Sequence, residues 1–505
     1  MQAAPLPSLG IAGTGLMGGG IAQVAAQAGC AVRLYDSRPG AALAARDAIG
    51  KQLERLAQKG KLDAGQARAA TARLMPVASL EDLRECGVVI EAIVEDLEAK
   101  RELFRALERA VAPDCVLATN TSSLSVTAIA AACERPERVA GMHFFSPVPL
   151  MKVVEVIDGV RTAPGVAERL LALGRAFGHT AVRAKDTPGF LVNHAGRAYG
   201  TEALRILSEG VAEFHVIDDV LREAAGFRMG PFELLDLTGL DVSQPVMDSI
   251  YRQFYEEPRF RPSPLLLQRR LGGLLGRKSG RGFYSYVEGV RRPIDASPVP
   301  AAPKPSVWVS RADAPLRERI EALAGKLGAR VEAGERPSAD AVCVLAPWGA
   351  DATSAALAED LDARRCVALD AWFGLETRRT LMGTPLTDSA VRDAARALFA
   401  ADGVPVSWIR DCPGFIAPRV VAQVVNVACD IAQQRIAAPA DIDRAVTLGL
   451  GYRQGPLAMG DALGPARVLV LLQSLLAFYG DPRYRPSPWL TRRARLGIPL
   501  ATAED

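Results

Sequence analysis

An internal repeat constrains the fold of this chain more than any other feature of its sequence. Residues 186–240 align without a gap with residues 411–465, and 15 of the 55 positions are identical. The matches include the PGF triplets at 188–190 and 413–415. Self-similarity at a fixed offset indicates a duplicated domain. Because neither copy contains a convincing strand pattern, we expect both to be helical.

The sequence before each repeat has a different character. Up to residue 185, short runs of β-forming residues alternate with helical stretches, which favours a doubly wound parallel sheet. A charged insert from Pro39 to about Ala72 is typical of a helical hairpin that leaves this sheet. Residues 306–410 read as a shortened, eroded copy of the same region. The expected strands of the first sheet are 8–13, 31–36, 88–93, 115–120, 139–144 and 152–157.

These patterns predict an α/β Rossmann domain and an all-α domain, followed by a degenerate second copy of each. A stretch with five prolines at 291–305 is typical of a semi-rigid linker between the copies. The expected boundaries are 1–185 for the first Rossmann domain, 186–287 for the first helical domain, 288–305 for the linker, 306–410 for the degenerate Rossmann-like domain and 411–505 for the second helical domain.

Composition excludes several classes of protein. A chain with 49% hydrophobic and 23% charged residues is not mostly disordered. A net charge of +3 is too small for a protein whose main partner is nucleic acid or an anionic membrane. The apolar runs fall short of the ~18 residues that a membrane helix needs, and no basic residue precedes the first of them, as a signal peptide would require. The eight dispersed cysteines indicate buried thiols in a reducing compartment, so we expect a cytoplasmic protein.

A glycine-rich loop follows the first expected strand. It reads Gly13-Thr14-Gly15-Leu16-Met17-Gly18 and opens a helix, and the next strand ends at Asp36. This context predicts that the loop binds the pyrophosphate of NAD and that Asp36 binds its ribose; an ordinary tight turn is the alternative. Arg38 lies close enough to leave some use of NADP open. The second copy has no glycine at 307–315, so we expect no dinucleotide there.

Four polar residues lie near expected strand ends or beside the domain boundary. His143 ends one strand, and Glu155, in the next, needs a partner because an unpaired buried carboxylate is costly. Ser122 follows a third strand, and Asn193 lies one turn into the first helix of the repeat. Each has an ordinary alternative, such as helix capping by Ser122. Together they suggest a polar site beside the glycine-rich loop.

Seven motifs together resemble those of the L-3-hydroxyacyl-CoA dehydrogenase family. The resemblance covers the first ~285 residues in order. The duplicated arrangement resembles the longer bacterial type associated with degradation of phenylacetate or other aromatic acids. The motifs are the glycine-rich loop with Asp36, EAIVEDLEAKRELF (91–104), ATNTSSLS (118–125), GMHFFSPVPLMKVVEV (141–156), KDTPGFLVN (185–193), GPFELLDLTGLD (230–241) and GRKSGRGFY (276–284).

The resemblance implies NAD-dependent oxidation of a (3S)-3-hydroxyacyl-CoA to a 3-oxoacyl-CoA, without a metal. The acyl group would be 3-hydroxyadipyl or 3-hydroxybutyryl. His143 would be the catalytic base and Glu155 its partner, while Ser122 and Asn193 would contact the substrate oxygen. Ser146 stands where many relatives carry asparagine. The positions that match cofactor contacts of the family are Glu95, Lys100, Ser146 and Lys278.

Two other functions stay open at this point: an NAD-dependent dehydrogenase of a β-hydroxyacid without coenzyme A, and a structural protein that binds NAD without turnover. We expect one active site per chain. We also expect the second helical domain to pack on the first, as an intrachain pseudo-dimer or within a homo-oligomer. In the second copy His143 aligns with Ala371, Asn193 with Pro418 and, loosely, Glu155 with Gly383.

Overall fold

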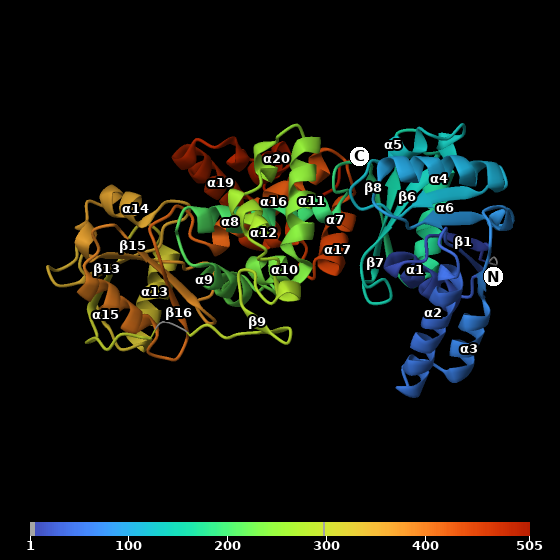
Figure 1. The fold of residues 1–505 in the computed structure, drawn as a ribbon. Helices are drawn as coiled ribbons and strands as arrows, with labels where there is room; N and C mark the ends of the chain where they lie inside the picture. Colours follow the sequence, from blue (N-terminus) through green and yellow to red (C-terminus); the bar gives the residue numbers. More distant parts are fainter. Residues whose placement is uncertain (1–5, 296–297, 505) are drawn as a thin grey trace. The chain divides into compact units, whose positions relative to one another are not determined.

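The computed structural model describes residues 6–295 and 298–504, which form two compact units (Figure 1). The first unit consists of residues 6–194 and 431–450. The second consists of residues 195–295, 298–430 and 451–504. A short part of the second repeat therefore belongs to the same unit as the first α/β segment.

The first unit is built on an eight-stranded sheet with the order β3-β2-β1-β4-β5-β6-β7-β8. All six of these expected strands are present, and β3 and β8 complete the sheet. The sheet is mixed rather than wholly parallel, because β6 and β7 are antiparallel. Only residues 145–152 join these two strands, too few for a helical crossover. The strands are β1 (Leu9–Ala12), β2 (Val32–Tyr35), β3 (Leu74–Pro76), β4 (Val88–Glu91), β5 (Val116–Thr119), β6 (Val139–Phe144), β7 (Val153–Asp158) and β8 (Thr180–Lys185).

Helices cover both faces of this sheet, so its central strands are buried on both sides. The predicted helical hairpin is formed by α2 and α3, which extend away from the sheet (Figure 1). Helix α17, from the second repeat, packs on β7 and β8. The helices are α1 (Leu16–Gln27), α2 (Ala41–Gln58), α3 (Ala64–Ala72), α4 (Leu97–Ala110), α5 (Val126–Ala130), α6 (Pro164–Ala176) and α17 (Pro439–Gly449), with 3₁₀ turns at Glu81–Leu83 and Pro136–Arg138.

The second unit combines helices of both repeats with a six-stranded sheet ordered β12-β11-β13-β14-β15-β16. A short hairpin, β9–β10, occupies the start of the expected linker. Residues 292–295 and 298–305 contain no helix or strand. The strands are β9 (Tyr286–Val287), β10 (Val290–Arg291), β11 (Ser306–Val309), β12 (Arg330–Val331), β13 (Val342–Leu345), β14 (Cys366–Leu369), β15 (Arg379–Gly383) and β16 (Val406–Ile409).

Helices α13, α14 and α15 pack on the second sheet, whereas the other helices of the second unit lie in the two predicted helical segments. Helices α7 and α16 include residues of both units. The helices are α7 (Val192–Ala195), α8 (Arg197–Ser208), α9 (Phe214–Asp219), α10 (Pro231–Thr238), α11 (Leu240–Gln253), α12 (Pro264–Leu271), α13 (Ala314–Lys326), α14 (Ala352–Ala358), α15 (Ser389–Phe399), α16 (Ala417–Gln433), α18 (Pro456–Leu463), α19 (Pro465–Tyr479) and α20 (Pro488–Leu496). A π-helical turn spans Val220–Ala224, and 3₁₀ turns span Pro258–Phe260, Arg277–Ser279, Ala363–Arg365 and Pro482–Tyr484.

Backbone contacts repeat at the same offset as the sequence. In the first unit the Lys185 N–H donates to the Ile436 carbonyl at 2.9 Å, so the first sheet contacts the second repeat. In the second unit the Arg410 N–H donates to the Val211 carbonyl at 2.9 Å, so the second sheet contacts the first repeat. Both donors and both acceptors are 225 residues apart. The duplication therefore includes a reciprocal exchange of contacts between the copies.

All eight cysteines are buried and free of disulfides, as predicted. Within the described residues, no single helix has the length and hydropathy to cross a membrane, and α18 with α19 meet the criterion only as a pair bent by 94°.

Candidate active site

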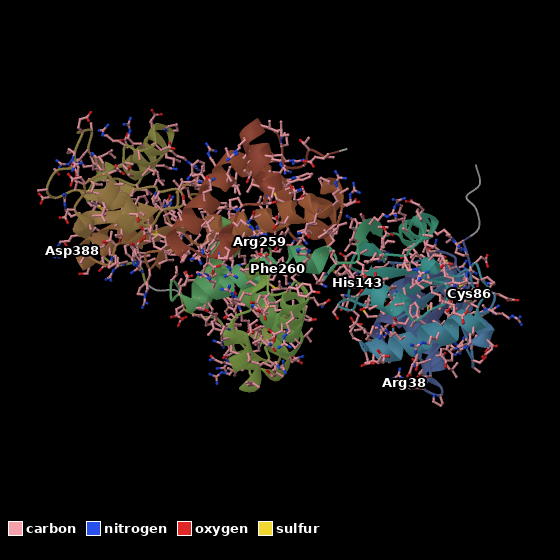
Figure 2. All side chains as sticks on the ribbon, turned by 90° about the horizontal axis from the view of Figure 1, so that it is seen from above. Arg38, Cys86, His143, Arg259, Phe260 and Asp388 are labelled. Carbon is pink, nitrogen blue, oxygen red and sulfur yellow. The ribbon has the colours of Figure 1, made fainter. Side chains whose placement is uncertain are left out.

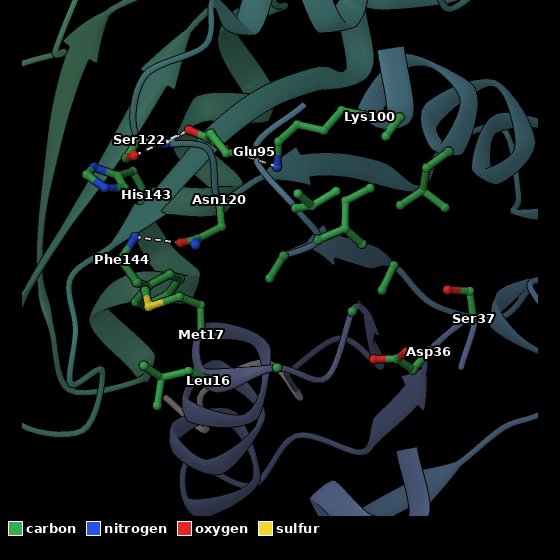
Figure 3. A pocket seen from close by; sticks show the side chains of 18 of the residues that line it. Leu16, Met17, Asp36, Ser37, Glu95, Lys100, Asn120, Ser122, His143 and Phe144 are labelled. Carbon is green, nitrogen blue, oxygen red and sulfur yellow. Dashed lines mark hydrogen bonds and ion pairs between the residues drawn. The ribbon is translucent and has the colours of Figure 1, made fainter. Parts of the chain in front are cut away.

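A pocket of about 1040 Å³ lies at the carboxyl ends of β1, β2, β4, β5 and β6 in the first unit. Ligands of open α/β sheets bind at this edge. Ser122 and His143 lie at one end of the pocket, whereas Asp36 and Ser37 lie at the other (Figure 3). Predicted site residues on its wall are Gly13, Gly15, Leu16, Met17, Asp36, Glu95, Lys100, Ser122, His143, Ser146 and Asn193.

The glycine-rich loop has the geometry that a pyrophosphate requires. Gly13 has a φ of +98°, and a Cβ there would lie 2.6 Å from the Ala92 carbonyl oxygen. A Cβ on Gly18 would lie 1.8 Å from the Gly13 carbonyl oxygen, so close packing of α1 requires glycine. Gly15, at the start of α1, faces open space, and no side chain caps the helix. The unused N–H groups of the first turn therefore fit the phosphates of NAD.

Asp36 directly follows β2, at the far end of the pocket. Its carboxylate accepts hydrogen bonds from Thr14 N and Oγ1, both at 2.9 Å, and from Arg38. The Arg38 guanidinium and the Thr14 donors hold the pKa of Asp36 well below its usual range, so the group is a charged acceptor. A charged acceptor here fits the ribose hydroxyls of NAD.

A network of charged residues supports the middle of the pocket. Lys100 Nζ lies 2.6 Å from Glu91 Oε1 and 3.4 Å from Glu95 Oε2. Burial alone would raise the pKa of Glu95, but the charge of Lys100 and hydrogen bonds from residues 121–123 outweigh it and lower the pKa. Glu95 accepts the Ser122 N–H at 2.9 Å and its hydroxyl at 3.3 Å. Glu91 was not predicted, since nothing in the strand pattern VVIE marks it as a partner of Lys100.

His143 and Glu155 meet inside the first sheet. The antiparallel register of β6 and β7 pairs them directly, and His143 Nδ1 lies 2.6 Å from Glu155 Oε2. Glu155 is fully buried; its other oxygen accepts the N–H groups of Leu191 and Val192 at 3.0 and 2.8 Å. A hydrogen on Nδ1 directed at the carboxylate leaves Nε2 with the free lone pair. The pair can therefore present a basic nitrogen to the pocket.

Asn120, at the end of β5, is a pocket residue that the sequence did not single out. Its Oδ1 accepts the Phe144 N–H at 2.8 Å, so its amide group is held next to the strand that carries His143 (Figure 3). Its place after an expected strand was the one available signal. Ser125, rather than Ser122, caps α5, so the capping alternative for Ser122 is wrong.

Lys278 is the one predicted site residue that belongs to the second unit. Its Nζ lies 2.6 Å from a carboxylate oxygen of Asp241. Its contact with the cofactor stays a prediction.

The second sheet lacks a counterpart of β4 among the residues that the structure describes. Strand β13 corresponds to β5, because each leads into a helix whose first amides bind equivalent carboxylates, Asp411 and Asp186. Yet β13 pairs directly with β11, whereas β4 separates β5 from β1. The second copy has therefore lost the strand of Glu91 and the segment that supplies Glu95 and Lys100.

Strand register also identifies the counterparts of His143 and Glu155. The β7–β8 and β15–β16 ladders share one register at the offset of 225, which places Thr380 at the position of Glu155. Asp370 lies opposite Thr380 and donates its N–H to the Thr380 carbonyl at 3.0 Å. Asp370 therefore takes the place of His143.

The expected counterparts, Ala371 and Gly383, were wrong for a simple reason. The paired positions are 12 residues apart in the first copy and 10 apart in the second, because the connection is shorter. The N-caps of α5 and α14, Ser125 and Asp351, repeat at an offset of 226, which places Trp348 at the position of Ser122. None of the four polar positions keeps its residue type in the second copy.

Comparison with known proteins decides the family. The family described as "3-hydroxyacyl-CoA dehydrogenase, NAD binding domain" matches residues 8–187, and its C-terminal domain matches residues 189–286 and 414–501. The chain belongs to the 3-hydroxyacyl-CoA dehydrogenase family. The predicted resemblance and Rossmann fold are thereby confirmed, and the protein is an NAD-dependent oxidoreductase that acts on the CH–OH group of 3-hydroxyacyl-CoA substrates.

Relatives in this family include single-copy and duplicated chains. The 3-hydroxyadipyl-CoA dehydrogenase of Escherichia coli K12 is 40% identical over 97% of this chain and 98% of its own. A solved structure of 3-hydroxybutyryl-CoA dehydrogenase from Escherichia coli K12 superposes with a TM-score of 0.85 at 36% identity, covering 98% and 99% of the two chains. A probable 3-hydroxybutyryl-CoA dehydrogenase of Bacillus subtilis is 44% identical but covers 55% of this chain and 96% of its own.

Proposed function

We propose that His143 is the catalytic base of this 3-hydroxyacyl-CoA dehydrogenase and that Glu155 positions it. The observation that carries this proposal is the 2.6 Å contact between them at the pocket beside the glycine-rich loop. His143 Nε2 takes the proton of the C3 hydroxyl, and Glu155 stabilises the imidazolium that forms. The glycine-rich loop and Asp36 would hold NAD, which would supply the acceptor for the C3 hydride.

Ser122 and Asn193 orient the C3 oxygen in this mechanism. Both line the pocket with His143, and Glu95 holds the Ser122 loop in place. Asn193 follows directly after the two amides that bind Glu155, so one carboxylate fixes both the base and the start of α7. Hydride transfer needs the reacting atoms at near-contact distance, which such positioning provides.

Replacement of His143 tests the role of this base. We expect His143→Gln to lower kcat by ~10²-fold or more while the Kd for NADH stays within about twofold, because the residue acts on the hydroxyl proton. His215→Gln, which changes a histidine outside the pocket, is the control. Steady-state assays and NADH fluorescence titration give the two readouts. Near-normal turnover of His143→Gln would remove it from the mechanism.

For the acyl group we propose 3-hydroxyadipyl-CoA. The duplicated relative that matches almost the whole chain bears that name, which supports a dicarboxylyl substrate. The name of the solved duplicated neighbour makes 3-hydroxybutyryl-CoA the second candidate. We expect kcat/KM to be at least ~10-fold higher for 3-hydroxyadipyl-CoA, since its acyl group is longer by a methylene and ends in a carboxylate that a fitting site would pair. Rates of NADH formation with both substrates test this preference. A higher kcat/KM for 3-hydroxybutyryl-CoA would overturn the proposed substrate.

We further propose one active site per chain, an assembly in which the two copies pack as an intrachain pseudo-dimer, and a location in the cytoplasm. The altered polar positions of the second copy support the first point, and the reciprocal contacts at Lys185 and Arg410 support the second. Eight buried free thiols are typical of a reducing compartment.

A further inference from the structure

The Asp36 carboxylate already has its full complement of donors. Thr14 contributes two hydrogen bonds; Arg38 contributes its backbone N–H and Nε, both at 3.0 Å from Oδ1, and Nη2 at 3.2 Å from Oδ2. A carboxylate offers about four lone-pair directions, so these five contacts leave no acceptor for a ribose diol. The ribose of NAD can reach Asp36 only if a donor leaves.

The Arg38 side chain is the donor that can leave. Thr14 is held within the glycine-rich loop and is 7% exposed, whereas the Arg38 side chain is 71% exposed at the edge of the first unit (Figure 2). An ion pair with so exposed a partner contributes little to stability, so solvent can replace it at small cost. The Asp36 side chain itself is only 6% exposed and stays in place.

Arg38 also lies where a 2′-substituent of the cofactor must come. It lines the pocket together with Asp36 and Ser37. Those two residues lie at the end of the pocket away from His143 (Figure 3). Enzymes that bind NADP use an arginine at this point of the fold to receive the 2′-phosphate. Among the described residues that line the pocket, the other cation is Lys100, which is paired with Glu91 and Glu95.

We infer that Arg38 sets the selectivity between NAD and NADP by moving between two partners. In the free protein its guanidinium covers Asp36; with NAD it swings into solvent; with NADP it pairs with the 2′-phosphate and offsets the repulsion from Asp36. The protein therefore binds NADP measurably beside NAD. This inference rests on the cofactor site described above, and it gives that site a second ligand class, adenosine 2′-phosphates.

Binding of small probes tests this without turnover. Adenosine 2′,5′-bisphosphate and 5′-AMP differ only in the 2′-phosphate, and their affinities can be measured by calorimetry on the full chain. The variants are Arg38→Ala and Arg38→Lys, with Arg109→Ala as a matched control because Arg109 is an exposed arginine of the same unit outside this pocket. NADH and NADPH titrations by fluorescence complete the set.

We expect Arg38→Ala to weaken the bisphosphate and NADPH by at least about tenfold and to leave 5′-AMP and NADH unchanged or somewhat tighter, since Asp36 no longer has to be uncovered. The affinities of Arg38→Lys for the bisphosphate and NADPH should lie between those of the parent and Arg38→Ala. The affinities of Arg109→Ala should equal those of the parent. An unchanged ratio of NADPH to NADH affinity in Arg38→Ala would overturn the proposed role of Arg38 in selectivity, but it would not contradict the cofactor site. Failure of the parent protein to bind NADH would overturn the cofactor site itself.

Discussion

Single residues at the glycine-rich loop set how closely the backbone can approach a ligand. Gly13 combines a positive φ with a carbonyl oxygen in the space that a side chain would fill. Gly29, at the end of α1, has a φ of +102° but nothing within 4 Å of its Cβ position. A comparison of the two glycines therefore distinguishes the effect of a positive φ from the effect of steric contact with a side chain.

We expect Gly13→Ala to weaken NADH binding by ~10-fold or more, because the added Cβ forces the loop away from Ala92. Gly29→Ala should carry only the strain of the left-handed backbone, ~1–2 kcal/mol, and keep its affinity for NADH. NADH titration and thermal unfolding of both variants separate the two effects. Equal NADH affinities would show that close approach at Gly13 is unimportant.

The sequence pattern brought together polar residues on neighbouring expected strands. It did not reveal an ion pair between a strand and the helix that follows it. His143 and Glu155 could be proposed because a buried acid needs a partner and the next strand supplied one. Glu91 pairs with Lys100, nine positions along the chain, only because the chain turns after β4 and α4 packs back against the sheet, where it contacts β5. A spacing of nine gives no periodic signal that separates this ion pair from two unrelated charges.

At the scale of elements, the second sheet keeps a polar position with no function that we can assign. Asp370, at the end of β14, is fully buried; one of its oxygens accepts the N–H groups of Trp372 and Phe373, and the other has no hydrogen-bond partner among the described residues. Burial raises the pKa of Asp370 to about 7. The carboxyl group is therefore protonated in the folded protein over a range where it ionises in the unfolded chain.

This shift has a definite sign. Because the folded protein holds the proton more tightly, the stabilisation is complete below the unfolded pKa of ~3.9 and is lost as the pH rises through about 7. The unfolding free energy of the parent should fall by about 1.4 kcal/mol for each pH unit across this window, relative to Asp370→Asn. Urea unfolding at pH 5 and pH 8 measures the difference, with Asp393→Asn, at a partly exposed carboxylate, as control. Equal pH dependence in parent and Asp370→Asn would refute the assignment.

One strand that the sequence missed is very short, and part of the second copy has changed register. Strand β3 has three residues and ends in proline, so it carries no alternation that could be recognised. The shortened connection between β14 and β15 changes the offset between the copies from 227 at His143 to 225 at Glu155. A single fixed offset therefore misplaced the counterpart of His143 by one position and that of Glu155 by three. A strand shifted by one residue presents the opposite face, so Ala371 was taken for Asp370.

For the whole molecule, we propose that only the first of the two copies is catalytic. The second copy lacks glycine at 307–315 and has no counterpart of β4 in the described structure. We expect calorimetric titration to give one equivalent of NADH per chain, because no second pyrophosphate loop is present. The protein concentration for this titration is best taken from its five tryptophans by absorbance. Two equivalents per chain would contradict the proposal.

The hydrogen bonds at Lys185 and Arg410 each join segments more than 190 positions apart on a single polypeptide. If such contacts joined separate chains, they would weaken on dilution, and stability would depend on protein concentration. Covalent continuity gives the two copies a high effective concentration for each other at any dilution. It also keeps the two copies in equal amounts. Each first copy therefore always has a second copy to pack against.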